Sequence, residues 1–191
     1  MRVTSGRLIY LMGASGSGKD SLLAFARTRL DGDHDLVVAH RYITRPLDLG
    51  HENYVSVSRG EFTLRQRKDL FLFTWSAHGL SYAIGREVDL WLDAGLAVVV
   101  GGSRQHFAES AKNWPNILPV LIDAPTETLR SRLLKRNRET PGDIELRLKR
   151  ANRFTIAHPA LITIDNSGPL DLAGEQLTSV LKKAARLSNE P

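Results

Sequence analysis

The sequence predicts an α/β fold in which a mostly parallel sheet is covered by helices on both faces. Short apolar stretches of strand length alternate with stretches of helix formers along most of the 191 residues. Residues 96–100 are apolar throughout, which is typical of a strand buried on both faces. Residues 8–12 run directly into a glycine-rich loop and then into a helical pattern. Because ligands collect beyond the carboxyl ends of parallel strands, this loop is the first place to look for a site.

The glycine-rich loop has the spacing of a phosphate-binding loop. Its residues are Gly13, Ala14, Ser15, Gly16, Ser17, Gly18 and Lys19. Glycines at these positions let successive backbone N–H groups turn toward one centre, and the lysine brings a charge to the β- and γ-phosphates of a nucleotide. We therefore expect these residues, with Asp20 and Ser21, to bind ATP.

The predicted metal ion is Mg²⁺, and the loop leaves two candidate ligands for it. The usual motif has Ser or Thr directly after the lysine, where the hydroxyl contacts the metal. Here Asp20 takes that place and the hydroxyl comes one residue later, in Ser21. Both side chains remain candidates.

The remaining pattern continues the alternation of strands and helices. We expect strands at residues 36–39, 70–75, 96–100, 117–122 and 161–164, and helices from Lys19 to about 30, at 60–68, at 87–94, from Thr126 onward and at 170–187. In the helix after Thr126, Leu129, Leu133 and Leu134 are expected to face inward. Two segments interrupt this order: residues 41–85, interpreted as an inserted acceptor-binding lobe, and residues 137–147, interpreted as a lid. The prediction is one domain with a core of about 6–40, 86–136 and 148–187.

Composition excludes several classes of protein. The chain has no cysteine, so disulfides and thiolate metal sites are ruled out. The first residues lack the apolar core of a signal peptide, and the longest apolar runs are far shorter than a membrane span. We therefore expect a cytoplasmic protein without a membrane partner.

The net charge of +5 is concentrated in one segment. Residues 130–153 contain nine Lys or Arg against three acids, whereas the rest of the chain is nearly balanced. Such a concentration suits a polyphosphate, and no nucleic-acid-binding motif accompanies it. We expect no nucleic-acid partner.

Arginines around the lid favour a kinase over a switch or motor protein. Arg132 and Arg136 lie one helical turn apart, Arg138 follows, and Arg147 and Arg150 open the next helical pattern. Charge spread over the transferred phosphoryl group is stabilised by planar cations that close over it. Lys19, Arg136 and Arg147 are the predicted catalytic residues.

Four segments, residues 13–19, 42–46, 50–57 and 132–148, resemble the guanylate kinase-like group of P-loop kinases. This resemblance covers nearly the whole chain and implies the three-layer P-loop NTPase fold. Within the group, the pair Lys19-Asp20 and residues 75–82 and 102–104 resemble the ribose 1,5-bisphosphate phosphokinases of phosphonate catabolism. That narrower likeness implies synthesis of 5-phosphoribosyl 1-diphosphate from ATP and ribose 1,5-bisphosphate.

Departures from true guanylate kinases favour a non-purine acceptor. Guanylate kinases have a second arginine where this chain has Asp48. They have a glutamate that contacts guanine where this chain has Thr74. They also end the central strand with an aspartate, in a region where this chain has Gly101 and Gly102. A site without these groups has lost its means of reading guanine.

A sugar bisphosphate needs several cations and neutral donors. The predicted substrate-binding residues are Arg45, Tyr54, His78, Tyr82, Ser103 and Arg104. Because the accepting group is already an anion, no general base is required and His78 is assigned to binding. Tyr54 and Tyr82 could instead belong to the core of the lobe.

Three other functions remain open at this point: a guanylate kinase or other small-metabolite kinase, a non-catalytic interaction module, and a nucleic-acid-dependent ATPase. The expected partner is a small sugar phosphate, and self-association as a homodimer is left open.

Overall fold

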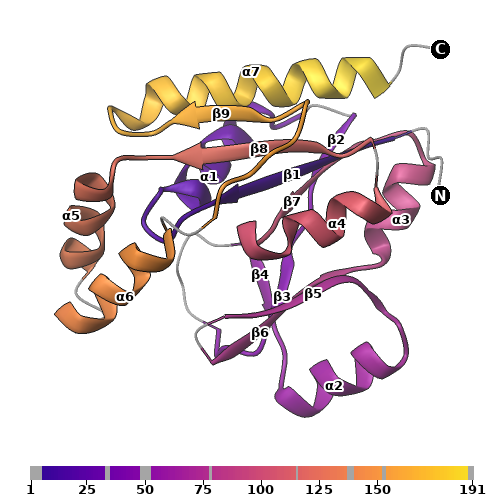
Figure 1. Cartoon of the computed structure of the whole chain (residues 1–191). Helices are drawn as coiled ribbons and strands as arrows, with labels where there is room; N and C mark the ends of the chain where they lie inside the picture. The colour runs from indigo at the N-terminus through magenta and orange to yellow at the C-terminus, as the bar shows by residue number, and fades with distance from the viewer. Residues whose placement is uncertain are drawn as a thin grey trace.

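Five parallel strands form the main sheet of the computed structural model (Figure 1), which describes residues 6–32, 35–47, 53–77, 79–114, 116–136, 140–151 and 154–188. Their order is β2-β7-β1-β8-β9. The strands are β1 (Arg7–Gly13), β2 (Leu36–Val38), β7 (Ala97–Gly101), β8 (Leu118–Asp123) and β9 (Ile162–Asp165). Every neighbouring pair is parallel, as the sequence predicts.

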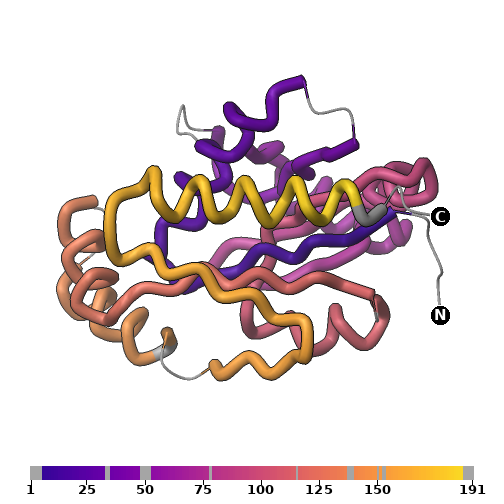
Figure 2. The backbone as a smooth tube through the Cα atoms, turned by 90° about the horizontal axis from the view of Figure 1, so that it is seen from above, coloured from indigo at the N-terminus to yellow at the C-terminus, as the bar shows by residue number. Residues whose placement is uncertain are grey.

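Helices cover both faces of this sheet. On one face α1 (Lys19–Arg29) and α7 (Leu170–Ser188) lie side by side, as Figure 2 shows from above. On the other face lie α3 (Glu87–Asp93) and α4 (Phe107–Asn113). Alternate side chains of β1 enter the two cores, Ile9 on the α1 side and Tyr10 on the other. The three-layer fold is confirmed. Among the described residues, no helix is long and apolar enough to span a membrane.

A second sheet of four strands lies below the main one in Figure 1. It has the order β4-β3-β6-β5, with β3 (Arg41–Ile43), β4 (Tyr54–Ser56), β5 (Phe71–Ala77) and β6 (Leu80–Gly85). Helix α2 (Arg59–Arg67) packs Phe62 against Phe71 of this sheet. The sequence predicted only α2 and β5 here. Strands β3 and β4 are three residues long, too short for an alternating pattern to appear.

Two helical segments also differ from the prediction. A short 3-10 turn, η1 (Arg104–His106), and α4 follow β7, where no helix was expected. Beyond α5 (Thr126–Arg136), helix α6 (Pro141–Ala151) begins well before residue 147, so most of the segment expected as a lid is helical. Leu129 and Leu133 are buried on α5, but the prediction for Leu134 was wrong, since it is 52% exposed. It lies one position, about 100°, past the buried stripe.

Candidate active site

The phosphate-binding loop is held from behind by two side chains that bond to its backbone. Asn166, just after β9, donates from Nδ2 to the Ser17 carbonyl at 2.7 Å. Arg132 on α5 donates from Nη1 to the same carbonyl at 3.3 Å and from Nη2 to the Asn166 carbonyl at 2.8 Å. Arg132 therefore supports the loop, which corrects the expectation that it joins the lid cations. Ser17 itself is fully buried.

Gly18 is required by this packing. It precedes α1 in the left-handed region, with φ of 84°, and a Cβ placed there would overlap the side-chain amide of Asn166. The turn that contains Asn166 was expected near the adenine, but the bond from Asn166 to the loop was not predicted. A usable signal existed, because Asn166 follows a strand of the parallel sheet and the carboxyl ends of such strands meet at one edge.

Lys19 ends the loop in an ion pair with its neighbour. Its Nζ lies 2.5 Å from Oδ1 of Asp20, and Nη2 of Arg41 lies 2.9 Å from the same oxygen. Burial alone would raise the pKa of Asp20, but the charges of Lys19, Arg41 and Arg136 hold it well below its ordinary value. Asp20 is thus an anion whose charge two neighbouring cations offset.

Asp20 and Ser21 line different cavities. Asp20 faces a small cavity between α1, the start of β3 and the end of β7, whereas Ser21 faces another beside Gly18, Arg136 and Asn166. Consecutive helix positions point about 100° apart, so one ion is not expected to reach both side chains. Both ion pairs are made by Oδ1 of Asp20, and the side chain is 46% exposed. A carboxylate oxygen there fits a hard divalent cation.

A larger cleft of about 620 Å³ opens from the phosphate loop toward the second sheet. It is lined by Gly13, Ala14, Ser15, Ser76, Ala77, Gly79, Ser103, Arg104, Gln105, Arg147, Ala151 and Phe154. Arg147 on α6 donates to the Ser15 hydroxyl at 2.9 Å. Arg104 donates to the Ala151 carbonyl at 3.0 Å, and burial lowers its pKa, an effect that Asp123 partly offsets. The cleft therefore places two arginines opposite the phosphate loop.

Tyr10 fixes the position of Ser103 at the wall of the cleft. Its hydroxyl donates to the Ser103 carbonyl and accepts from the Ser103 N–H, both at 3.1 Å. Burial raises the pKa of Tyr10 to about 12. A Cβ on Gly102 would overlap the Tyr10 ring, so glycine is needed there for a close approach.

Three other predicted substrate residues make contacts of their own in the second sheet or beside it. Tyr54 is buried, donates to the Pro46 carbonyl at 2.8 Å and has the Arg45 guanidinium 4.4 Å from its ring centre. Tyr82 stacks on Trp75 with ring centres 5.5 Å apart. None of Arg45, Tyr54 and Tyr82 is among the described residues that line the cleft. His78 lies outside the described residues.

Solved structures share the fold. Guanylate kinase from Anaplasma phagocytophilum superposes with a TM-score of 0.67 at 17% identity, covering 96% of this chain and 88% of that one. A sugar kinase from Janibacter gives a TM-score of 0.53 at 18% identity, covering 97% and 99%. At these identities the likeness concerns the fold alone.

Sequence comparison identifies much nearer relatives, although no protein-family model matches the chain. It is 51% identical over 175 residues to a ribose 1,5-bisphosphate phosphokinase from Desulfomicrobium baculatum, covering 92% of this chain and 94% of that protein. It is 45% identical over 183 residues to a protein of the same name from Psychromonas ingrahamii, covering 95% and 93%. With a phosphate loop, facing arginines and these relatives, the chain belongs to the ribose 1,5-bisphosphate phosphokinase family.

Proposed function

We propose that this protein transfers the γ-phosphoryl group of ATP to ribose 1,5-bisphosphate, giving 5-phosphoribosyl 1-diphosphate and ADP. The observation that carries the proposal is the cleft in which Arg104 and Arg147 face the phosphate loop. A guanylate kinase is not favoured, because the near relatives are named for the sugar bisphosphate and Thr74 stands where guanylate kinases have their guanine-reading glutamate.

The donor nucleotide lies along the phosphate loop in this proposal. Backbone N–H groups of residues 13–19 bind its phosphates, and Lys19 contacts the β- and γ-phosphates. The cavity beside Gly18, Arg132 and Asn166 is open at the other side of the loop and is where we place the adenine.

Asp20 is the residue we assign to Mg²⁺. When bound, the ion would neutralise charge on the β- and γ-phosphate oxygens. The carboxylate fits because it directly follows Lys19 and stays ionised. Ser21 faces the adenine side instead.

The acceptor occupies the cleft between the phosphate loop and the second sheet. Arg104 and Arg147 neutralise its phosphates, and hydroxyls of Ser76 and Ser103 bind the sugar. A second cavity, which contains Thr44, Arg59 and Thr74, shares Ser76 and Gly79 with this cleft. In this proposal the acceptor region continues along the β5-β6 hairpin, where the two cavities share these residues. Arg45 does not line either cavity, but it follows Thr44 of the second one, and on that ground we assign it to the second phosphate.

The reaction needs alignment and charge neutralisation. An oxygen of the acceptor's 1-phosphate forms a bond to the γ-phosphorus, while the bond from that phosphorus to the β–γ bridging oxygen breaks and ADP leaves. The attacking oxygen is already ionised, so no proton has to be removed. We assign Lys19, Arg136 and Arg147 to the charge that spreads over the transferred group. Arg136 lines the cavity given to the adenine, and its charge also acts on Asp20 beside Lys19.

Phosphorus NMR tests the proposal directly. The protein is incubated with ATP and Mg²⁺ and, in separate samples, with ribose 1,5-bisphosphate or GMP. We expect a new diphosphate attached to the sugar and no GDP. The Lys19→Met variant, which keeps an unbranched side chain of similar length and removes the charge, serves as the control for contaminating kinases.

GDP formation that depends on Lys19 would replace the proposal by a guanylate kinase. Absence of product from both acceptors, with ATP bound, would contradict the assigned acceptor.

A further inference from the structure

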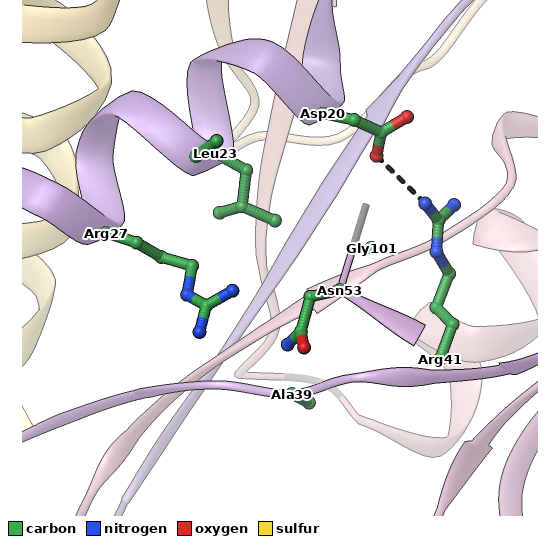
Figure 3. Close-up of a pocket in the computed structure, with 8 residues that line it drawn as sticks. Asp20, Leu23, Arg27, Ala39, Arg41, Asn53 and Gly101 are labelled. Carbon is green, nitrogen blue, oxygen red and sulfur yellow. Dashed lines mark hydrogen bonds and ion pairs between the residues drawn. The ribbon is translucent and has the colours of Figure 1, made fainter. Parts of the chain in front are cut away.

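Arg41 connects the second sheet to the phosphate loop through Asp20. It is the first residue of β3, and its Nη2 lies 2.9 Å from Oδ1 of Asp20 on α1. Figure 3 shows the two side chains pointing toward one another across a small cavity. Arg41 is only 12% exposed, less than an arginine on an open surface. No sequence pattern indicates this contact, since β3 was not predicted.

The same carboxylate oxygen is also bound by Lys19, at 2.5 Å. One anionic oxygen is therefore shared by two cations from different parts of the fold. Lys19 has a second task in the proposed reaction, which is to contact the phosphates of ATP. Its three N–H donors are then shared between Asp20 and the phosphates, so its contact with Asp20 weakens when the nucleotide binds.

The free-energy cost of moving Lys19 from Asp20 to the phosphates depends on which other charges lie near Asp20. A partly buried carboxylate that loses its only cation is strongly destabilised, whereas one that keeps a hydrogen-bonded guanidinium is not. Arg136 adds a more distant positive charge. Arg41 is the cation in direct contact that can stay in place, because it comes from the second sheet and has no part in the phosphate loop.

The surroundings of Arg41 hold it in this position. Its backbone N–H donates to the Asn53 carbonyl at 3.2 Å, next to the pairing of β3 with β4. A Cβ on Gly101, at the end of β7, would lie 3.7 Å from Nζ of Lys19 and 3.9 Å from Cζ of Arg41. Both cations therefore lie against the same end of β7.

We propose that Arg41 is a positioning residue that neutralises Asp20 and keeps it in place while Lys19 moves from Asp20 to the nucleotide's phosphates. The proposal rests on the use of Lys19 for ATP described above. It adds a residue of the second sheet to the donor site, so the two halves of the molecule are coupled through one carboxylate.

Nucleotide binding without metal tests the proposal, because it isolates the exchange at Lys19 from any ion held by Asp20. ATP affinity is measured by calorimetric titration in EDTA. We expect Arg41→Gln to bind ATP about tenfold more weakly, since Lys19 then leaves a carboxylate with no directly bound cation. Arg41→Lys should recover much of the loss. Asp20→Asn should bind at least as tightly as the native protein, and the double variant Asp20→Asn/Arg41→Gln should match Asp20→Asn.

The matched control is Arg27→Gln, which removes the same charge from the same cavity. Arg27 comes from α1 and is not the partner of Asp20 in either ion pair, so we expect native affinity. Thermal unfolding of each variant checks that it is folded. If Arg41→Gln does not fold, Arg41→Lys and the double variant still carry the comparison.

Two results would overturn the proposal. Native affinity in folded Arg41→Gln would reduce Arg41 to a structural tie between the sheets, and a double variant as weak as Arg41→Gln would show that Asp20 does not mediate the effect. Either result leaves the kinase reaction intact if the native protein forms product by NMR. A native protein that binds no ATP would overturn both proposals.

Discussion

The donor and acceptor sides of the site are built in different ways. On the donor side, Asn166 and Arg132 bond to the carbonyl of Ser17, so backbone atoms of the phosphate loop are held directly. On the acceptor side, the cleft is lined largely by side chains of the β5-β6 hairpin, the turn after β7 and α6. The donor site depends on chain geometry, whereas the acceptor site depends on how separate elements are brought together.

This difference has a consequence for substitutions. A change in the donor side should disturb the loop itself and lower both stability and nucleotide binding. A change in the acceptor side should leave the loop intact and alter one contact with the substrate. Specificity can therefore vary on the acceptor side without loss of the kinase scaffold.

The largest effect is expected for Gly18→Ala. The new methyl group would overlap Asn166 and also force a non-glycine residue to φ of 84°, at a total cost of about 3 kcal/mol in the free energy of unfolding. Gly32→Ala is the control, because Gly32 has the same φ but no atom within 4 Å of the added Cβ. It should cost only about 1 kcal/mol. Equal values in urea denaturation would show that the Asn166 contact is unimportant.

The second-largest effect is expected for Arg147→Ala, and it concerns catalysis. Its guanidinium contacts the phosphate loop at Ser15 from α6, so its loss should lower kcat about 100-fold while ATP affinity changes little. Lys149→Ala removes an exposed cation from the same helix and should leave kcat unchanged. The measurement is steady-state ADP release. An equal fall in both variants would point to a general effect of charge near the cleft.

Tyr10→Phe should have a smaller effect than Arg147→Ala, on both stability and acceptor binding. The variant keeps the buried ring but removes two hydrogen bonds to Ser103, at a cost of about 1 kcal/mol in unfolding free energy. Because Arg104 follows Ser103, KM for the acceptor should rise and KM for ATP should not. A rise in KM for ATP alone would contradict this separation.

The smallest effect concerns the pH dependence of stability. The pKa of Asp20 is lowered in the folded protein from its ordinary value of 3.8, so the unfolded chain takes up this proton first. The ionised Asp20 therefore stabilises the folded protein above about pH 3.8, and this contribution is lost as the pH falls further toward the lowered pKa of the folded state. With a half-exposed carboxylate, we expect less than about 1 kcal/mol. Urea unfolding of native protein and Asp20→Asn should differ more at about pH 6 than at about pH 3. An equal difference in unfolding free energy between the two proteins at both pH values would contradict this prediction.

Local sequence signals were sufficient for the main sheet and the phosphate loop. Strands such as β7 are continuous apolar runs, and the loop residues are adjacent in the chain, so their order alone indicates their function. Prediction failed for β3, β4, β6 and α4. These are three to seven residues long, and their stability comes from contacts with distant segments.

The sequence by itself determined the three-layer fold, the nucleotide site and, through family resemblance, the class of kinase. Only the tertiary structure decided which arginine does what. Arg132 and Arg147 look alike in the sequence, yet one supports the back of the loop and the other faces the cleft. The contact of Arg41 with Asp20 depends on the position of β3, so only the tertiary structure reveals it. Helical periodicity fixes the face of a side chain, but the partner across that face is set by long-range packing, which a local pattern does not contain.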